Sequence, residues 1–183
     1  LTLQANLRAW GQLPLRPRVL RRLGGSHSRV SLLGREFASP LIVAPMAHQG
    51  LLHPHAEAAT ALAAAAQGAG FVLSTQSNTA MEDIASLVRP EAARGPLWFQ
   101  LYWQPTREAT LALVRRAEAA GYTAIVWTVD AAIKRASFPL PAGVEAANLR
   151  GFPAVRHTSQ PGQGALVLGT ALADAAPHWD DLD

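Results

Sequence analysis

The sequence predicts an α/β fold in which parallel strands alternate with helices. Four short apolar segments typical of strands begin near residues 41, 71, 97 and 124, which gives a strand–helix unit about every 27–30 residues. This spacing is typical of a (β/α)8 barrel or of a doubly wound sheet. Polar side chains also gather at the carboxyl ends of these segments, where both folds carry their chemistry.

Two features precede the first unit. Residues 1–22 are helix-prone and end in a basic cluster at residues 16–22. We interpret this cluster as a solvated or carboxylate-paired face, because a nucleic-acid site would need interleaved aromatic residues and only Trp10 is near. Residues 29–33 and 36–38 then predict two short strands around a turn that contains Gly34.

The first unit begins with Leu41–Ala44, a continuous apolar run that predicts a strand buried on both faces. Pro54 marks the start of an alanine-rich helix that extends to Gln67 and ends at Gly68. The second strand is predicted at Phe71–Leu73.

The second unit carries a clear helix signal. Thr79-Ala-Met-Glu82 has the form of a capping box, and it predicts a helix that stops before Pro90. The third strand, Leu97–Tyr102, follows. Alternate side chains of a strand share a face, so Trp98, Gln100 and Tyr102 are expected to point one way and Leu97, Phe99 and Leu101 the other.

The third unit repeats the pattern. Thr106 is expected to cap a helix over residues 107–120, which Gly121 ends, and a fourth strand is predicted at Ala124–Val129. An apolar stripe along this helix is formed by Leu111, Val114 and Ala117. After Asp130 the repeat of strand–helix units ends. Residues 131–164 predict a long loop over the active face, and a helix is predicted within 165–182.

Length and composition indicate a single domain of 183 residues with 49% hydrophobic residues. We divide it into residues 1–40 (helix and hairpin), 41–130 (four units) and 131–183 (loop and next helix). There is no cysteine, no apolar run long enough to span a bilayer and no signal-peptide pattern, so we expect a soluble cytoplasmic protein. The sequence pI of about 10.2 reflects an excess of arginine rather than a nucleic-acid partner.

The strongest chemical signal is a set of polar residues at neighbouring strand ends, namely Gln100, Tyr102, Thr128 and Asp130. A buried amide or hydroxyl without a partner costs about 1–3 kcal/mol. Either a flat ring with donor and acceptor edges binds these groups, or they bond to each other or to trapped water. Ser74, Thr75 and Gln76 add hydroxyl and amide groups at the end of the preceding strand.

The end of the first strand and the absence of two kinds of motif restrict the ligands that this chain can bind. At the end of the first strand, Pro45 lacks an N–H, and the small side chains of Ala44 and Ala47 let the backbone approach a flat ligand. The histidines have no metal-binding spacing, and no P-loop and no Gly-x-Gly-x-x-Gly motif follow a strand. We therefore expect no metal site and no Rossmann-type dinucleotide fold.

With these residues identified, the chain resembles the FMN-dependent α-hydroxy acid oxidases and dehydrogenases, such as glycolate oxidase, lactate oxidase and mandelate dehydrogenase. The resemblance runs in order through six segments, which are Leu15-Arg-Pro-Arg-Val-Leu, Ala44-Pro-Met-Ala, Leu73-Ser-Thr, Trp98-Phe-Gln-Leu-Tyr, Ala117-Glu-Ala-Ala-Gly-Tyr and Thr128-Val-Asp. It implies a (β/α)8 barrel, of which this chain supplies about the first four units. Other FMN barrels, or a non-catalytic half-barrel that acts as a binding or assembly module, are the alternatives.

The resemblance also implies roles for individual residues. The backbone at Pro45, Met46 and Ala47 would lie against the flavin, and Ser74, Gln100 and Thr128 would hydrogen-bond its isoalloxazine ring. Tyr102 would be the catalytic residue in this half, bonding the carboxylate or hydroxyl of a small 2-hydroxy acid. Gln76 would also line the substrate pocket, at a position where some relatives carry an aromatic residue.

The chain departs from the family pattern in several places. Relatives carry a longer stretch with a substrate-binding arginine between Asp130 and Phe138, and we do not transfer that role to Lys134 or Arg135. The family's catalytic histidine, its lysine and arginine, and the FMN phosphate site would lie beyond Asp183. The expected partners are therefore the C-terminal half of the barrel, a 2-hydroxy acid and, in a homo-oligomer, further copies of the protein, with no nucleic acid and no membrane.

Overall fold

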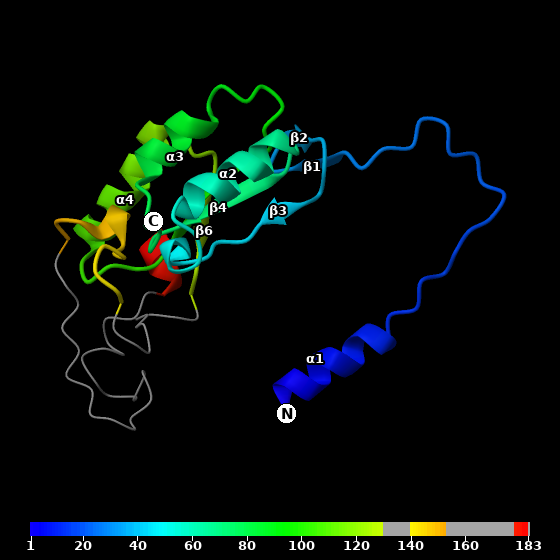
Figure 1. Ribbon diagram of the computed structural model, residues 1–183, viewed down its shortest axis with the longest axis horizontal. Coiled ribbons are helices and arrows are strands. Elements are labelled where there is room, and N and C mark those ends of the chain that lie inside the picture. The colour runs from blue at the N-terminus through cyan, green and yellow to red at the C-terminus, as the bar shows by residue number, and fades with distance from the viewer. Residues whose placement is uncertain (130–139, 153–177, 183) are drawn as a thin grey trace.

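The computed structural model describes residues 1–129, 140–152 and 178–182. Its main sheet has four strands in the order β3-β4-β5-β6, and every neighbouring pair is parallel. The strands are β3 (Ile42–Val43), β4 (Gly70–Ser74), β5 (Leu97–Leu101) and β6 (Ile125–Trp127). Helices α2 (Ala56–Ala66), α3 (Met81–Val88) and α4 (Arg107–Ala120) connect them and pack on one face (Figure 1). The predicted alternation of parallel strands and outer helices is confirmed.

The core lies between the sheet and these helices. Leu97, Phe99 and Leu101 of β5 point into it, together with Ile84 of α3 and Leu113 of α4. Phe99 is completely buried and packs edge-on against Tyr122, whose ring centroid is 5.9 Å away. The Tyr122 hydroxyl donates to the Met81 carbonyl at 3.0 Å, and burial raises the pKa of this phenol far above its ordinary value. The predicted alternation of faces along β5 is therefore confirmed.

The segments before the sheet differ from the expected long helix. Helix α1 covers only Thr2–Gly11, because Pro14 and Pro17 cannot continue a helix whose interior N–H groups must all donate. None of its residues is buried, and it stands apart from the sheet (Figure 1). The predicted hairpin is confirmed as β1 (Val30–Leu32) and β2 (Arg35–Phe37), which are antiparallel. Leu33 and Gly34 form its turn with φ values of 50° and 72°, as a type I′ turn requires.

The capping box predicted at Thr79–Glu82 is wrong. Ala80 is the N-cap of α3, and its side chain makes no capping bond. Instead the Met81 N–H donates to Oδ1 of Asn148 at 2.8 Å, across 67 residues of chain. Glu82 pairs with Arg116 of α4, Nε to Oε1 at 2.9 Å, and this bond holds the pKa of Glu82 below its ordinary value. Tertiary contacts have replaced the local motif.

Two predictions of burial are also corrected. β3 is only half buried, because it is an edge strand of the described sheet and one side has no neighbouring strand there. In α4 the buried residues are Thr110, Leu113 and Ala117, whereas Leu111 is 36% exposed. Leu111 and Val114 instead line an open groove beside the sheet. The cap of α4 is as expected, since Thr106 accepts the Ala109 N–H and Gly121 ends the helix at φ 93°.

Three short 3-10 turns complete the described chain, η1 (Gln49–Leu51), η2 (Ala147–Leu149) and η3 (Trp179–Leu182). The last falls within the helix predicted at 165–182, most of which lies outside the described residues. The loop predicted at 131–164 is described only from 140 to 152. There η2 is anchored by the Ala147 N–H, which donates to the Ser77 carbonyl at 2.8 Å.

Candidate functional site

The carboxyl ends of β4, β5 and β6 meet at one edge of the sheet because the three strands are parallel. Ser74 is the Cα partner of Gln100, and Gln100 in turn faces Val126. Thr128 directly follows β6, and its N–H donates to the Leu101 carbonyl at 3.0 Å. The structure thus brings three of the sequence-predicted residues, Ser74, Gln100 and Thr128, together on adjacent strands.

A continuous hydrogen-bond chain joins these three side chains. The Ser74 hydroxyl donates to Oε1 of Gln100 at 3.3 Å, and Nε2 of Gln100 donates to the Thr128 hydroxyl at 2.8 Å. The Thr75 N–H also donates to Oε1 of Gln100, at 3.3 Å. Gln100 is only 2% exposed. Because its amide oxygen and nitrogen both form hydrogen bonds, the amide has one fixed orientation. Of the two alternatives left open by the sequence, a bound ring or bonding among the polar residues themselves, the second is therefore present.

This mutual bonding still leaves donor capacity for a ligand. An amide nitrogen carries two hydrogens, and among the described residues the bond to Thr128 engages one of them. The Thr128 oxygen accepts that bond and keeps its own hydrogen to donate. One N–H of Gln100 and the neighbouring O–H of Thr128 can therefore donate to the acceptor edge of a flat heterocycle such as an isoalloxazine. The residues present therefore fit the predicted ring.

The segment after β3 lies beside this edge. Pro45 and Met46 are exposed and Ala47 is half buried, so the backbone here is open to a ligand. His48 follows with left-handed backbone angles, φ 53° and ψ 46°, and its N–H donates to the Gln76 carbonyl at 3.1 Å. This bond connects the loop after β3 to the loop after β4. Burial lowers the pKa of the His48 imidazole, and the negative charge of Glu57 partly offsets this lowering.

The two predicted substrate residues also lie at this edge. The Tyr102 N–H donates to the Thr75 hydroxyl at 3.1 Å, and the Gln76 N–H donates to the Ser74 hydroxyl at 3.1 Å. Both residues are half buried. The main-chain N–H groups of Tyr102 and Gln76 are therefore held by the hydroxyl groups of Thr75 and Ser74. Asp130, the remaining predicted member, lies outside the described residues.

Sequence reasoning missed the groups that hold these loops in place. Glu57 and Asn148 are both completely buried, and Asn78 bonds to two loops. Nδ2 of Asn148 donates to the Ser77 hydroxyl at 2.8 Å and to the Ser74 carbonyl at 3.3 Å. No local pattern marks Asn148, since the partners of its side chain are 67 to 74 residues away. Glu57 was detectable only as a lone acid in an alanine-rich helix.

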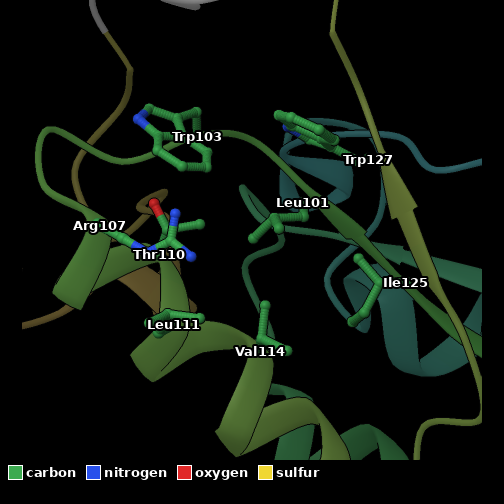
Figure 2. A pocket seen from close by; sticks show the side chains of 8 residues that line it. All are labelled: Leu101, Trp103, Arg107, Thr110, Leu111, Val114, Ile125 and Trp127. Carbon is green, nitrogen blue, oxygen red and sulfur yellow. The ribbon is translucent and has the colours of Figure 1, made fainter. Parts of the chain in front are cut away.

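A separate groove opens on the helix-covered side of the sheet (Figure 2). It has a volume of about 260 Å³, and its lining comes from the ends of β5 and β6 and from α4. Its rings Trp103 and Trp127 are 5.8 Å apart, and the buried Nε1 of Trp127 has no hydrogen-bond partner among the described residues. Because Leu101 and Trp127 point away from the face that carries Gln100, this groove is not part of the candidate site.

Two classes of feature are absent from the part of the chain that the structure describes. It holds no group of three or more histidine or acidic side chains placed to bind a metal ion. None of its helices has the length and apolar character needed to cross a membrane.

Comparison with known proteins shows the family to which this chain belongs. A family model described as FMN-dependent dehydrogenase matches residues 1–183. L-lactate oxidase of Alicycliphilus denitrificans is 46% identical over 189 residues, which cover 99% of this chain and 50% of that protein. 4-Hydroxymandelate oxidase of Amycolatopsis orientalis is 38% identical over 189 residues, which cover 100% of this chain and 51% of that protein. The chain therefore spans about half the length of the curated relatives it matches.

Solved structures show the same fold. A crystal structure of mandelate oxidase with 3,3-difluoro-2-hydroxy-3-phenylpropionic acid superimposes with a TM-score of 0.71 at 40% identity. The superposition covers 80% of this chain and 44% of that one. Together with the parallel sheet, this identifies the fold as part of a (β/α)8 barrel.

Proposed function

Since this chain belongs to the FMN-dependent dehydrogenase family, we propose that it is the N-terminal half of an enzyme that oxidises an L-2-hydroxy acid to the 2-oxo acid with FMN. The observation that carries the proposal is the side-chain bridge from Ser74 through Gln100 to Thr128. It places the remaining N–H of Gln100 and the hydroxyl of Thr128 at the carboxyl ends of neighbouring strands, where a (β/α)8 barrel carries its active site.

The proposed roles follow from this arrangement. Ser74, Gln100 and Thr128 would hold the edge of the isoalloxazine ring, and the backbone of residues 45–47, exposed at Pro45 and Met46, would lie against it. When bound, FMN supplies the two-electron redox chemistry, and the protein supplies orientation and electrostatics. Because Gln100 is already oriented by its neighbours, little reorganisation is needed when a ring binds.

The substrate is placed by residues at the same edge. We assign Tyr102 to bond the carboxylate or hydroxyl of the hydroxy acid, and Gln76 to line the pocket. A polar amide at 76 favours a substrate with a small or polar side chain. The relatives named L-lactate oxidase and 4-hydroxymandelate oxidase support the class of substrate but span both small and aromatic acids.

The remaining machinery belongs to the second half of the barrel. The resemblance implies that the histidine that removes the substrate proton, and the FMN phosphate site, lie beyond Asp183. The proposal also includes a cytoplasmic location and a homo-oligomeric state. Cell fractionation and the mass of the purified protein in solution test these two points.

Product formation by the full-length protein tests the proposed activity. Purified protein is supplied with L-lactate, glycolate or L-mandelate and with oxygen or an artificial electron acceptor, and the 2-oxo acid is measured. We expect the L acids to be oxidised and D-lactate to be left unchanged. A protein that holds FMN but forms no 2-oxo acid from any of these would contradict the proposal and favour another class of FMN barrel.

A further inference from the structure

Glu57 is an acidic residue with no exposed surface, and nothing in the proposed chemistry uses it. It is the second residue of α2, next to the helix amino terminus. Burial of a carboxylate is costly unless hydrogen bonds replace its lost water. The identity of its donors therefore shows what this side chain does.

The carboxylate joins two loops that are separate in sequence. Oε1 accepts the Gln49 N–H of the β3–α2 loop at 3.2 Å. Oε2 accepts three donors of the β4–α3 loop, each at 3.1 Å, which are the N–H groups of Asn78 and Thr79 and the Thr79 hydroxyl. These four donors match a carboxylate, which only accepts hydrogen bonds.

Bonds to a charged acceptor are stronger than bonds between neutral groups. Glu57 also lies between the amino termini of α2 and α3, since Asn78 and Thr79 come just before Ala80, the N-cap of α3. Helix amino termini favour a negative charge. A single side chain thus fixes both loops with charge-assisted bonds. A glutamine at this position would place an NH2 group, itself a donor, opposite N–H and O–H donors, and some of these bonds would be lost.

Other contacts close the same junction. The Gly50 N–H donates to Oδ1 of Asn78 at 2.7 Å, and a Cβ at Gly50 would lie only 2.8 Å from that oxygen. The His48 N–H reaches the Gln76 carbonyl. The loops joined here follow the neighbouring strands β3 and β4, and they carry residues 45–47 and Gln76 of the candidate site.

We propose that Glu57 is a positioning residue for the flavin and substrate site. It holds the loop of residues 44–55 against the loop of residues 75–80, and in this way it sets the backbone that faces the ring. Glu57 itself touches neither ring nor substrate. This inference rests on the proposed function, since it assigns a role toward the same site.

The test compares Glu57→Gln with Glu108→Gln in the full-length protein. Glu108 is the matched control because it is also the second residue of its helix, α4, but is exposed. Hydrogen exchange of peptides covering residues 44–55 and 75–80 is measured without added FMN, and the dissociation constant of FMN is measured separately. We expect faster exchange in both loops and about tenfold weaker FMN binding for Glu57→Gln, and values like those of the natural sequence for Glu108→Gln.

A second variant keeps the test decisive if Glu57→Gln does not fold. Thr79→Val removes one donor to Oε2 and leaves the backbone donors, so a smaller change in the same direction is expected for exchange and for FMN binding. Loops that exchange faster without any loss of FMN affinity would show a merely structural role and would overturn the inference. Unchanged exchange in a folded Glu57→Gln or Thr79→Val variant would also overturn it.

Failure of the proposed function gives a different result. A full-length protein of natural sequence that binds no FMN overturns the proposed function and the inference together. A protein that binds FMN, with an affinity that Glu57→Gln leaves equal to that of Glu108→Gln, overturns the inference alone.

Discussion

At the scale of single residues, the site is organised by one amide. Gln100 accepts from β4 and donates toward β6, so it connects three strands through one side chain. The strand alternation in the sequence predicted which face Gln100 occupies, and the structure confirms it. The chain of bonds to Ser74 and Thr128 could not be predicted from the alternation, because it depends on the register of Ser74 opposite Gln100.

Replacement of Gln100 by Leu tests its contact with the ring. The leucine keeps most of the volume but removes the amide donors, so we expect FMN binding to the full-length protein to weaken by about 1–2 kcal/mol. The dissociation constant is measured by titration of the FMN-free protein with FMN. Gln67→Leu, at an exposed position after α2, is the control. An equal dissociation constant in the two variants would contradict the assignment of Gln100.

At the scale of elements, tertiary contacts replaced signals that look local. The sequence predicted the existence and order of α2, α3 and α4, because apolar spacing and end signals are local properties. It did not predict the cap of α3, which comes from Asn148 in the segment that follows the fourth strand. Long-range caps of this kind leave no trace in neighbouring residues.

Replacement of Asn148 by Ala tests this remote cap. The Met81 N–H would lose its acceptor, and the Ser77 hydroxyl would lose a donor, so we expect the free energy of unfolding to fall by about 1–2 kcal/mol. Urea denaturation of the full-length protein gives this value. Asn6→Ala in the exposed helix α1 serves as the control and is expected to change stability little. A stability loss no larger than that of Asn6→Ala would show that Asn148 does not stabilise α3.

At the scale of the whole molecule, the described sheet has two outer strands, β3 and β6. In a closed barrel each strand has two neighbours, and relatives of about twice this length provide the additional chain. The hairpin covers part of the face that carries Gln100, because the ring of Phe37 packs edge-on against Trp98 with 6.5 Å between ring centroids. The repeat of strand–helix units predicted the fold class, but this contact between hairpin and sheet was not foreseen.

Expression of residues 1–183 alone tests the half-barrel account. Unpaired strand edges and an open inner face favour association, so we expect a protein that aggregates or self-associates, retains little FMN and oxidises no hydroxy acid. Its mass in solution and its FMN content are measured beside those of the full-length protein. A soluble monomer that binds FMN tightly and oxidises lactate or mandelate would contradict this account.

We expect the strand ends around Gln100 to form part of a site that binds FMN and an L-2-hydroxy acid. The most direct measurement is the visible absorption of the full-length protein, recorded without oxygen before and after addition of L-lactate or L-mandelate. We expect flavin absorption bands that are lost on addition of at least one L acid and remain on addition of its D enantiomer. Bound flavin whose absorption is unchanged by any 2-hydroxy acid, or a full-length protein without flavin bands after incubation with FMN, would contradict it.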